Sequence, residues 1–256
     1  MLAIERKHKI LDLILRDRKV VVTELSQQFG VTEETVRRDL NKLEQDGLVS
    51  RTHGGAVARR GEVEDLPYRT RHLTNLEAKR AIATEVAELV DDGMSVMMDS
   101  SSTAFEALAT LRAHRDLTLI TNSVRILSDP DLTGHTIMSV GGELRRRSMT
   151  FVGPLAREAI GQFNADVALI SCKALSPSGG IMETNVPDAE VKRAFIRNAQ
   201  RVCLLVDGDK FDRSALITIC GFERIHTVIT DRQPAPAWAD VFERAGATLI
   251  VASPLQ

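Results

Sequence analysis

The chain has 256 residues, with 43% hydrophobic residues, 27% charged residues and a formal net charge of −2 at pH 7. These values are ordinary for a soluble globular protein, and the length suffices for one small and one larger domain. The sequence contains neither a signal peptide nor an apolar run of 18 residues. This excludes a membrane-spanning chain and predicts a cytoplasmic protein with no membrane partner.

Charge is unevenly distributed along the chain. The first 60 residues carry 12 Lys and Arg against 9 Asp and Glu, whereas the remaining residues carry 21 against 26. Neutralising phosphates is the basis of non-specific affinity for nucleic acid. The basic N-terminal part is therefore the part that we expect to bind DNA.

The N-terminal part begins with the pattern of a small helical domain. Residues 4–18 place apolar side chains at helical spacing and predict an opening helix, and residues 20–22 predict a short strand. Two short helical runs follow, and Thr23 and Thr32 each precede one of them as possible N-caps. Gly30 lies between the runs, where glycine permits the positive φ of a sharp turn. This spacing predicts a helix-turn-helix.

The second of these helical runs has an apolar and a polar face. Val36, Leu40 and Leu43 recur at i, i+4 and i+7, which predicts that they form the buried face. At about 100° per residue, Arg38 points away from this face, with Asn41 beside it. Arg and Asn match base edges in the major groove, whereas Lys and Thr suit phosphates. The alternative is an ordinary solvated face, since most charge clusters on helices are no more than that.

The segment after this helix favours DNA binding over the alternative. Residues 46–47, Asp-Gly, are expected to end the helix, and residues 48–51 predict a short strand. Residues 52–55 then predict a tight turn that can act as a wing over the DNA backbone. Arg51 and His53 lie where they can reach phosphates.

The run TVRRDLNKLEQDGLVSRTHGGA, residues 35–56, resembles the signature of the DeoR family of bacterial transcription regulators. The resemblance runs without a gap from about residue 5 to residue 56, and it implies a winged helix-turn-helix whose motif proper spans residues 20–39. We therefore expect a domain at residues 3–58 that binds double-stranded operator DNA. The expected DNA-binding residues are Thr32, Thr35, Arg37, Arg38, Asn41, Lys42, Arg51 and His53.

A linker and a second domain are expected next. Residues 59–75 lose periodicity and gather charge, glycine and proline, which is typical of a linker. From residue 76 to residue 256, short apolar strands alternate with helices. This alternation predicts an α/β fold with a mostly parallel sheet that is covered on both faces. The expected helices are 77–90, 103–111 and 187–199, and the expected strands are 95–99, 117–120, 136–140, 167–170, 202–206, 227–230 and 248–251.

Several of these strands end in small or polar residues, and ligands bind at the carboxyl ends of strands in such sheets. The run 99–103, Asp-Ser-Ser-Ser-Thr, leads directly into a helix, where hydroxyls and free N–H groups meet at a positive helix terminus. This pattern predicts an anion site with phosphate as the natural ligand. The alternative is that Ser102 or another hydroxyl only caps the helix. Other strands are followed by Asn122, by Gly141 and Gly142, which would allow close ligand approach, by Lys173, and by Asp207 and Lys210.

The second half also resembles the DeoR family, in its C-terminal sensor domain. The matching pieces are DSSST, TNS, GGELRRRSMTFVGP, DGDKF and ITD. The resemblance implies the fold of ribose-5-phosphate isomerase and a phosphorylated sugar as effector, with Ser101, Ser102 and Thr103 on the phosphate. Ser101 stands where most members have glycine, and the serine-rich loop resembles that of members that respond to deoxyketose 1-phosphates of fucose and rhamnose. The expected effector site comprises Asp99, Ser100, Ser101, Ser102, Thr103, Asn122, Gly141, Gly142, Lys173, Asp207 and Lys210.

The three cysteines are unevenly spaced within apolar, strand-like runs. Cys172, Cys203 and Cys220 therefore have the pattern of reduced, buried thiols, and their spacing fits neither a disulfide framework nor a zinc site. We expect no metal, no cofactor and no catalytic residue.

The leading hypothesis is a transcription regulator that represses a sugar-catabolism operon and is released by a phosphorylated sugar. Because operator sites are usually repeated, we expect a homo-oligomer, either a dimer or a tetramer. One alternative is a phosphosugar isomerase that carries a DNA-binding domain, with Asp99, Asp207 and Lys210 as acid and base groups. Against it, the sequence shows no convincingly spaced pair of carboxylates and no clear nucleophile with a base. A regulator that activates transcription is a third possibility.

Overall fold

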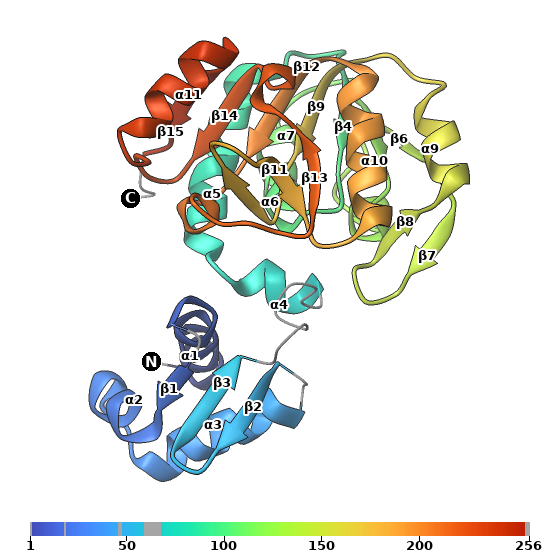
Figure 1. Cartoon of the computed structure of the whole chain (residues 1–256). Helices are drawn as coiled ribbons and strands as arrows, with labels where there is room; N and C mark the ends of the chain where they lie inside the picture. Colours follow the sequence, from blue (N-terminus) through green and yellow to red (C-terminus); the bar gives the residue numbers. More distant parts are fainter. Residues whose placement is uncertain (1, 18, 46–47, 59–67, 254–256) are drawn as a thin grey trace. The chain divides into compact units, whose positions relative to one another are not determined.

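The computed structural model of the chain divides into two compact units, residues 1–75 and residues 76–256 (Figure 1). Each unit has a hydrophobic core of its own. The structure describes residues 2–17, 19–45, 48–58 and 68–253.

The first unit combines helices with a small antiparallel sheet. Its three strands lie in the order β1-β3-β2, so the short strand expected near residues 20–22 is present and pairs with the wing. That strand ends at Val21, because Val22 already belongs to the next helix. The elements of this unit are α1 (Ala3–Asp17), β1 (Lys19–Val21), α2 (Val22–Phe29), α3 (Glu33–Gln45), β2 (Val49–Thr52), β3 (Gly55–Ala58) and α4 (Tyr68–Leu73).

Apolar side chains from the helices and the sheet form the core of the first unit. Val36, Leu40 and Leu43 of α3 are buried, as predicted, together with Ile10 and Ile14 of α1. Burying one aliphatic side chain contributes roughly 1.5–3 kcal/mol. The apolar stripe therefore determines which face of α3 points outward.

Two local predictions for this unit are wrong. Thr23 does not cap α2, because the helix begins at Val22 and the N–H of Val22 donates instead to the carbonyl oxygen of Gly54, 2.8 Å away in the wing. Part of the expected linker is helical, since α4 covers Tyr68–Leu73. The Asp-Gly pair at 46–47, which was expected to end α3, lies outside the described residues.

The second unit is built on a seven-stranded sheet in which all strands run parallel. The strand order is β15-β14-β12-β9-β4-β5-β6. This architecture confirms the predicted α/β class. The strands are β4 (Ser95–Met98), β5 (Thr118–Thr121), β6 (Thr136–Ser139), β9 (Ala165–Ile170), β12 (Ala199–Leu205), β14 (Thr227–Thr230) and β15 (Thr248–Val251).

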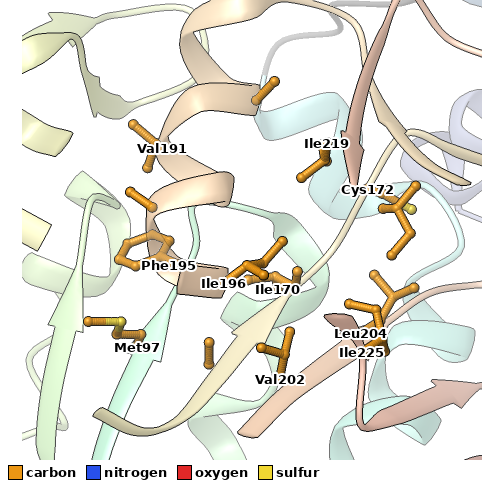
Figure 2. Packing of buried hydrophobic residues seen from close by; sticks show 14 of the residues in the cluster. Met97, Ile170, Cys172, Val191, Phe195, Ile196, Val202, Leu204, Ile219 and Ile225 are labelled. Carbon is orange, nitrogen blue, oxygen red and sulfur yellow. The ribbon is translucent and has the colours of Figure 1, made fainter. Parts of the chain in front are cut away.

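Helices cover both faces of this sheet, as predicted. Met97 of β4 belongs to the core beneath α10, whereas its neighbours Val96 and Met98 belong to the core on the opposite face. Figure 2 shows the first of these cores, in which Val191 and Phe195 of α10 lie over the strands. The helices and 3-10 turns are α5 (Leu76–Thr84), η1 (Glu85–Leu89), α6 (Ser102–Glu106), α7 (Leu108–Leu111), α8 (Val124–Leu127), α9 (Pro154–Ile160), α10 (Val186–Arg197), η2 (Gly208–Lys210), η3 (Phe222–Arg224) and α11 (Ala237–Ala245).

Two small antiparallel sheets were not predicted from the sequence. β7 (Glu143–Arg145) and β8 (Thr150–Val152) form a hairpin. β10 (Ala174–Ser176), β11 (Gly180–Glu183) and β13 (Ile217–Cys220) form a three-stranded sheet. Each of these strands has only three or four residues, too few for an alternation of apolar and polar side chains to be recognised.

Two predicted helices are shorter than expected. The helix expected at 77–90 ends at Thr84 and continues as the 3-10 turn η1. The helix expected at 103–111 is divided into α6 and α7, because the N–H of Ala107 bonds to the carbonyl oxygen of Ala104, three residues back instead of four.

All three cysteines are free thiols, and Cys172 and Cys203 are buried as predicted, whereas Cys220 is partly exposed. Burial raises the pKa of Cys172 and Cys203 to about 12 and that of Cys220 to about 11, so the thiols are protonated at neutral pH. Among the described residues, no three His, Cys, Asp or Glu side chains group together as a metal site. No helix in the described part of the chain has the length and hydropathy needed to cross a membrane.

We predict that Gly55→Ala disrupts the wing. A Cβ at Gly55 would lie 1.9 Å from the backbone oxygen of Val20, so β3 must move away from β1. Such overpacking costs about 1–3 kcal/mol. Hydrogen–deuterium exchange of the full chain should become faster in β1 and β3 and stay unchanged in the second unit.

Gly54→Ala is the matched control, because a Cβ at Gly54 would have no heavy atom within 4 Å. If both variants exchanged at the wild-type rate, the close contact between β1 and β3 would not require a glycine.

Candidate nucleic-acid interface and sensor site

The turn between α2 and α3 is fixed by Gly30 and Thr32. Gly30 has a φ of +63°, as predicted for this position, and its N–H donates to the carbonyl oxygen of Gln27. Thr32 Oγ1 accepts a hydrogen bond from the N–H of Thr35 at 3.3 Å, so the prediction that Thr32 caps α3 is confirmed. The turn and the cap together determine where α3 begins.

The outward face of α3 carries Arg38 and Asn41, as the helical spacing predicted. Both side chains are exposed. Neither has a hydrogen bond or an ion pair with any residue that the structure describes. Because no described residue occupies them, the Arg38 guanidinium and the Asn41 amide are available to base edges.

The flanks of this face are partly engaged within the chain. Arg37 and Lys42 are exposed, and Arg37 Nη2 lies 2.6 Å from Glu33 Oε2 one turn earlier. The hydroxyls of Thr32 and Thr35 bond to each other at 2.9 Å. These residues therefore border Arg38 and Asn41 at positions suited to phosphate contacts.

The wing is attached to α3 through Arg51. The N–H of Arg51 donates to Glu44 Oε1 at 2.8 Å, and its guanidinium Nη1 donates to the carbonyl oxygen of Arg37 at 3.4 Å. Arg51 is half-buried and braces the wing, whereas His53 is exposed in the turn between β2 and β3. The predicted wing is thus present, with His53 at its tip.

A buried ion pair that the sequence analysis missed joins α1 to α3. Arg6 Nε lies 2.6 Å from Asp39 Oδ2, and the two side chains are 9% and 8% exposed. Asp39 directly precedes the buried Leu40, and an acidic residue beside the apolar stripe was the signal that could have revealed the pair. The ion pair fixes α3 against α1.

In the second unit, the parallel strands bring polar residues together at one edge. β4 lies between β5 and β9, and β9 lies between β4 and β12. The residues that follow these four strands are therefore neighbours, as predicted, and each is at most 3% exposed. They are Asp99, Asn122, Ser171 and Asp207.

The hydroxyls of the loop after β4 divide into two groups. Ser101, and not Ser102, is the N-cap of α6, because its Oγ accepts from the N–H of Ala104 at 3.0 Å. The capping alternative thus holds for Ser101. The hydroxyls of Ser100 and Thr103 have no hydrogen-bond partner among the described residues.

Asn122 has a buried amide oxygen that accepts no hydrogen bond from the residues the structure describes. Its Nδ2 donates to Thr150 Oγ1 at 2.6 Å and to the carbonyl oxygen of Phe151 at 3.0 Å. Because that carbonyl oxygen can only accept, the amide nitrogen must face Phe151. Within the described part of the chain, Oδ1 then has no donor. A buried acceptor left in this state costs about 1–3 kcal/mol, which a ligand donor would offset.

Gly141 and Gly142 both adopt positive φ, at +63° and +108°. The sequence predicted a close approach of a ligand to them. At Gly142 it is the backbone of β8 that comes close, since a Cβ there would lie 2.6 Å from the backbone oxygen of Val152. A Cβ at Gly141 would meet no heavy atom within 4 Å.

Lys210 lies at the same edge, within reach of the strand ends. Its Nζ is 3.2 Å from Asp207 Oδ2 and donates to Ser171 Oγ at 3.3 Å. The Lys210 side chain is 21% exposed and so remains accessible to a ligand. Lys173 follows β9 and is half-buried.

Two charged residues that the sequence analysis did not select complete this edge. Lys192 Nζ lies 3.0 Å from both Asp99 Oδ2 and Glu183 Oε2. Burial alone would lower the pKa of Lys192, but the charges of Asp99 and Glu183 raise it above its usual value. Burial alone would raise the pKa of Glu183, but Lys192 and Lys173 bring it down to about 2. Lys192 lies among buried apolar residues of α10. A lysine on an apolar helix face was the sequence signal that could have revealed this buried ion pair.

Two family models match the chain, one in each unit. The DeoR-like helix-turn-helix domain matches residues 6–60, and the DeoR C terminal sensor domain matches residues 74–232. Among solved structures, a D-ribose-5-phosphate isomerase in complex with phospho-erythronic acid is similar to 52% of this chain and 52% of that chain. Its sequence identity is 16% and its TM-score 0.39.

Curated relatives match over most of their length. The transcriptional repressor AccR of Agrobacterium fabrum is 35% identical over 89% of this chain and 89% of its own length. The glycerol-3-phosphate regulon repressor of Escherichia coli is 31% identical over 90% of this chain and 91% of its own. The L-fucose operon activator of Haemophilus influenzae is 32% identical over 89% of this chain and 91% of its own.

We predict that Arg6→Met destabilises the first unit by about 3–5 kcal/mol, because it leaves the Asp39 carboxylate buried without its partner. The free energy of unfolding of the first unit can be measured by denaturing the full chain chemically and monitoring hydrogen exchange in α1 and α3. Arg37→Met is the matched comparison, since its ion pair with Glu33 has side chains that are 49% and 41% exposed. Arg37→Met should lower the free energy of unfolding by less than about 1 kcal/mol. Equal losses in both variants would contradict the assigned role of Arg6.

Proposed function

The chain belongs to the DeoR family of transcription regulators, and we propose that it represses a sugar-catabolism operon until a phosphorylated sugar releases it from its operator. As a member of this family it is a DNA-binding transcription regulator with a sensor domain. The observation that carries the proposal is the polar edge of the parallel sheet. There the buried Asn122 Oδ1 and the hydroxyls of Ser100 and Thr103 have no hydrogen-bond partner among the described residues. The names of the glycerol-3-phosphate regulon repressor and AccR support repression.

In this proposal α3 binds the major groove of double-stranded operator DNA. Arg38 and Asn41 contact base edges, because both side chains are exposed and neither bonds to another residue in the described part of the chain. The surrounding residues contact the phosphate backbone and fix the orientation of the helix. They are Thr32, Thr35, Arg37, Lys42, Arg51 and His53.

The effector occupies the carboxyl edge of the sheet. The hydroxyls of Ser100 and Thr103 bond to no residue that the structure describes, which supports a phosphate at the loop after β4. Asn122 Oδ1 accepts from a sugar hydroxyl, because it is buried and has no donor among the described residues. Lys210 and Lys173 supply positive charge at this edge.

Release from the operator requires differential binding. The effector must bind the DNA-free arrangement more tightly than the DNA-bound one, since equal affinity for both would shift nothing. A tenfold preference corresponds to about 1.4 kcal/mol. Because helix-turn-helix proteins usually bind repeated half-sites, the proposal includes a homo-oligomer, either a dimer or a tetramer.

A second candidate function is activation of a sugar operon, favoured by the similarity to the L-fucose operon activator at 32% identity. A reporter fused to the regulated promoter separates the two, since loss of a repressor raises expression and loss of an activator lowers it. The fucose- and rhamnose-type branch remains a prediction, because relatives of several kinds match at 31–35% identity. The isomerase alternative has no support from the relatives, which are regulators and not enzymes.

We predict that Arg38→Ala removes most of the preference for the operator. Losing a bidentate contact to a base costs about 1–3 kcal/mol of discrimination. Affinity should be measured at one fixed salt concentration, for the duplex selected by the wild-type chain and for an unrelated duplex. Lys19→Ala, which removes an exposed cation of β1 in the same unit, is the control for lost charge alone. An Arg38→Ala chain that still prefers the selected duplex as strongly as wild type would refute the assigned face.

We predict that Lys210→Met weakens the response to the effector without changing operator affinity. The substitution removes the cation that bridges Asp207 and Ser171. The concentration of sugar phosphate needed for half-release should rise by roughly tenfold, equivalent to the loss of one charge-assisted hydrogen bond. Arg213→Met is the control, because Arg213 is exposed three residues further along the chain. An unchanged release curve would exclude Lys210 as a ligand.

A further inference from the structure

A cluster of three buried charges lies at the carboxyl edge of the sheet. Lys192 of α10 has ion pairs with Asp99, at the end of β4, and with Glu183, at the end of β11, each at 3.0 Å. Its Nζ also donates to the carbonyl oxygen of Ser171 at 2.6 Å. An ammonium group has three N–H donors, and these three contacts use all of them. With a side chain only 8% exposed, Lys192 is therefore occupied within the protein.

Asp99 uses both of its carboxylate oxygens to hold two strand ends together. Oδ1 accepts from the N–H of Ser101 at 2.9 Å, and Oδ2 accepts from the N–H of Ser171 at 2.9 Å. Ser101 belongs to the loop after β4, and Ser171 follows the neighbouring strand β9. The Asp99 side chain is 1% exposed, and its hydrogen bond from the N–H of Ser101 fixes the position of this loop.

The conformation of Asp99 depends on Lys192. A buried carboxylate is costly unless it is paired and hydrogen-bonded, and Lys192 is its cationic partner. Glu183 has separate support, because its Oε1 accepts from the N–H of Thr184 at 3.0 Å. Removing Lys192 therefore affects Asp99 and the serine loop, whereas neutralising Glu183 leaves the contact between Lys192 and Asp99 in place.

We propose that Lys192 is a positioning residue of the sensor site, which acts through Asp99 to hold the Ser100–Thr103 loop against the end of β9. This inference rests on the proposed function for its consequence in effector binding. Its structural part concerns the ligand-free protein and can be tested alone.

The first test measures amide exchange in the full chain without any ligand, by NMR. In Lys192→Met, the N–H groups of Ser101 and Ser171 should exchange about tenfold faster, because their shared acceptor is no longer held in place. In Glu183→Gln they should exchange at the wild-type rate. Unchanged exchange of both N–H groups in Lys192→Met would overturn the inference.

The second test measures binding of inorganic phosphate and of a panel of sugar phosphates by calorimetry. For any probe that binds the wild type, Lys192→Met should weaken binding by at least about tenfold, and Glu183→Gln by less than about threefold. The effect of Lys192→Met should disappear in an Asp99→Asn background, because both changes interrupt one connection. Additive losses would show that Lys192 does not act through Asp99.

If Lys192→Met does not fold, a charge-matched double variant can be tested in its place. Lys192→Met combined with Glu183→Gln removes one cation and one anion, so the net charge of the cluster is that of the wild type. This double variant should melt cooperatively and still show fast exchange at Ser101 and Ser171. If no probe binds the wild type, the proposed function fails, and the exchange measurement still decides the role of Lys192.

Discussion

All seven strands of the central sheet run in one direction, and the polar residues that follow them must therefore meet at a single edge. In this protein that constraint gathers carboxylates, lysines, hydroxyls and an amide in a buried region. Buried polar groups have to be hydrogen-bonded or paired. Asp99 satisfies this requirement by bonding to two strand ends and to Lys192. The groups that have no partner within residues 2–17, 19–45, 48–58 and 68–253, above all Asn122 Oδ1, are those with which a ligand can bond.

The first unit meets a different constraint. An apolar stripe and the buried pair between Arg6 and Asp39 fix α3 against the rest of the unit. With the inner face determined in this way, Arg38 and Asn41 point outward and keep their donors and acceptors for a partner outside the chain. Rigid presentation lowers the cost of ordering these side chains on binding. The packing of the small core thus fixes the orientation in which α3 presents Arg38 and Asn41 to a partner.

Local sequence patterns predicted the parts of the structure that are determined locally. The turn at Gly30, the cap at Thr32 and the buried stripe of α3 follow from spacing over a few residues. The parallel sheet also followed, because each strand is a short apolar run between helices. By contrast, Thr23 was expected to cap α2, but it does not. The free N–H of Val22 at the start of α2 donates to the carbonyl oxygen of Gly54, which is distant in the sequence.

The contacts that complete the sensor site are non-local, and the sequence did not reveal them. Lys192 reaches Asp99 only because α10 packs across the sheet, 93 residues further along the chain. The hairpin of β7 and β8 bonds to Asn122 through Thr150 and Phe151, and its strands are too short for a recognisable pattern. Ser101 rather than Ser102 is the cap, because Ser101 has the extended backbone of an N-cap (φ −70°, ψ 150°) and α6 begins at Ser102.

In the proposed function, one chain couples operator binding to a phosphorylated sugar. This coupling is tested most directly by titrating the complex of the full chain and its operator, at fixed salt, with sugar phosphates and with the corresponding unphosphorylated sugars. If the two sites are coupled, at least one sugar phosphate weakens operator binding by about tenfold or more, whereas its unphosphorylated form has no effect. Operator affinity that is the same in the presence of every sugar phosphate would contradict it.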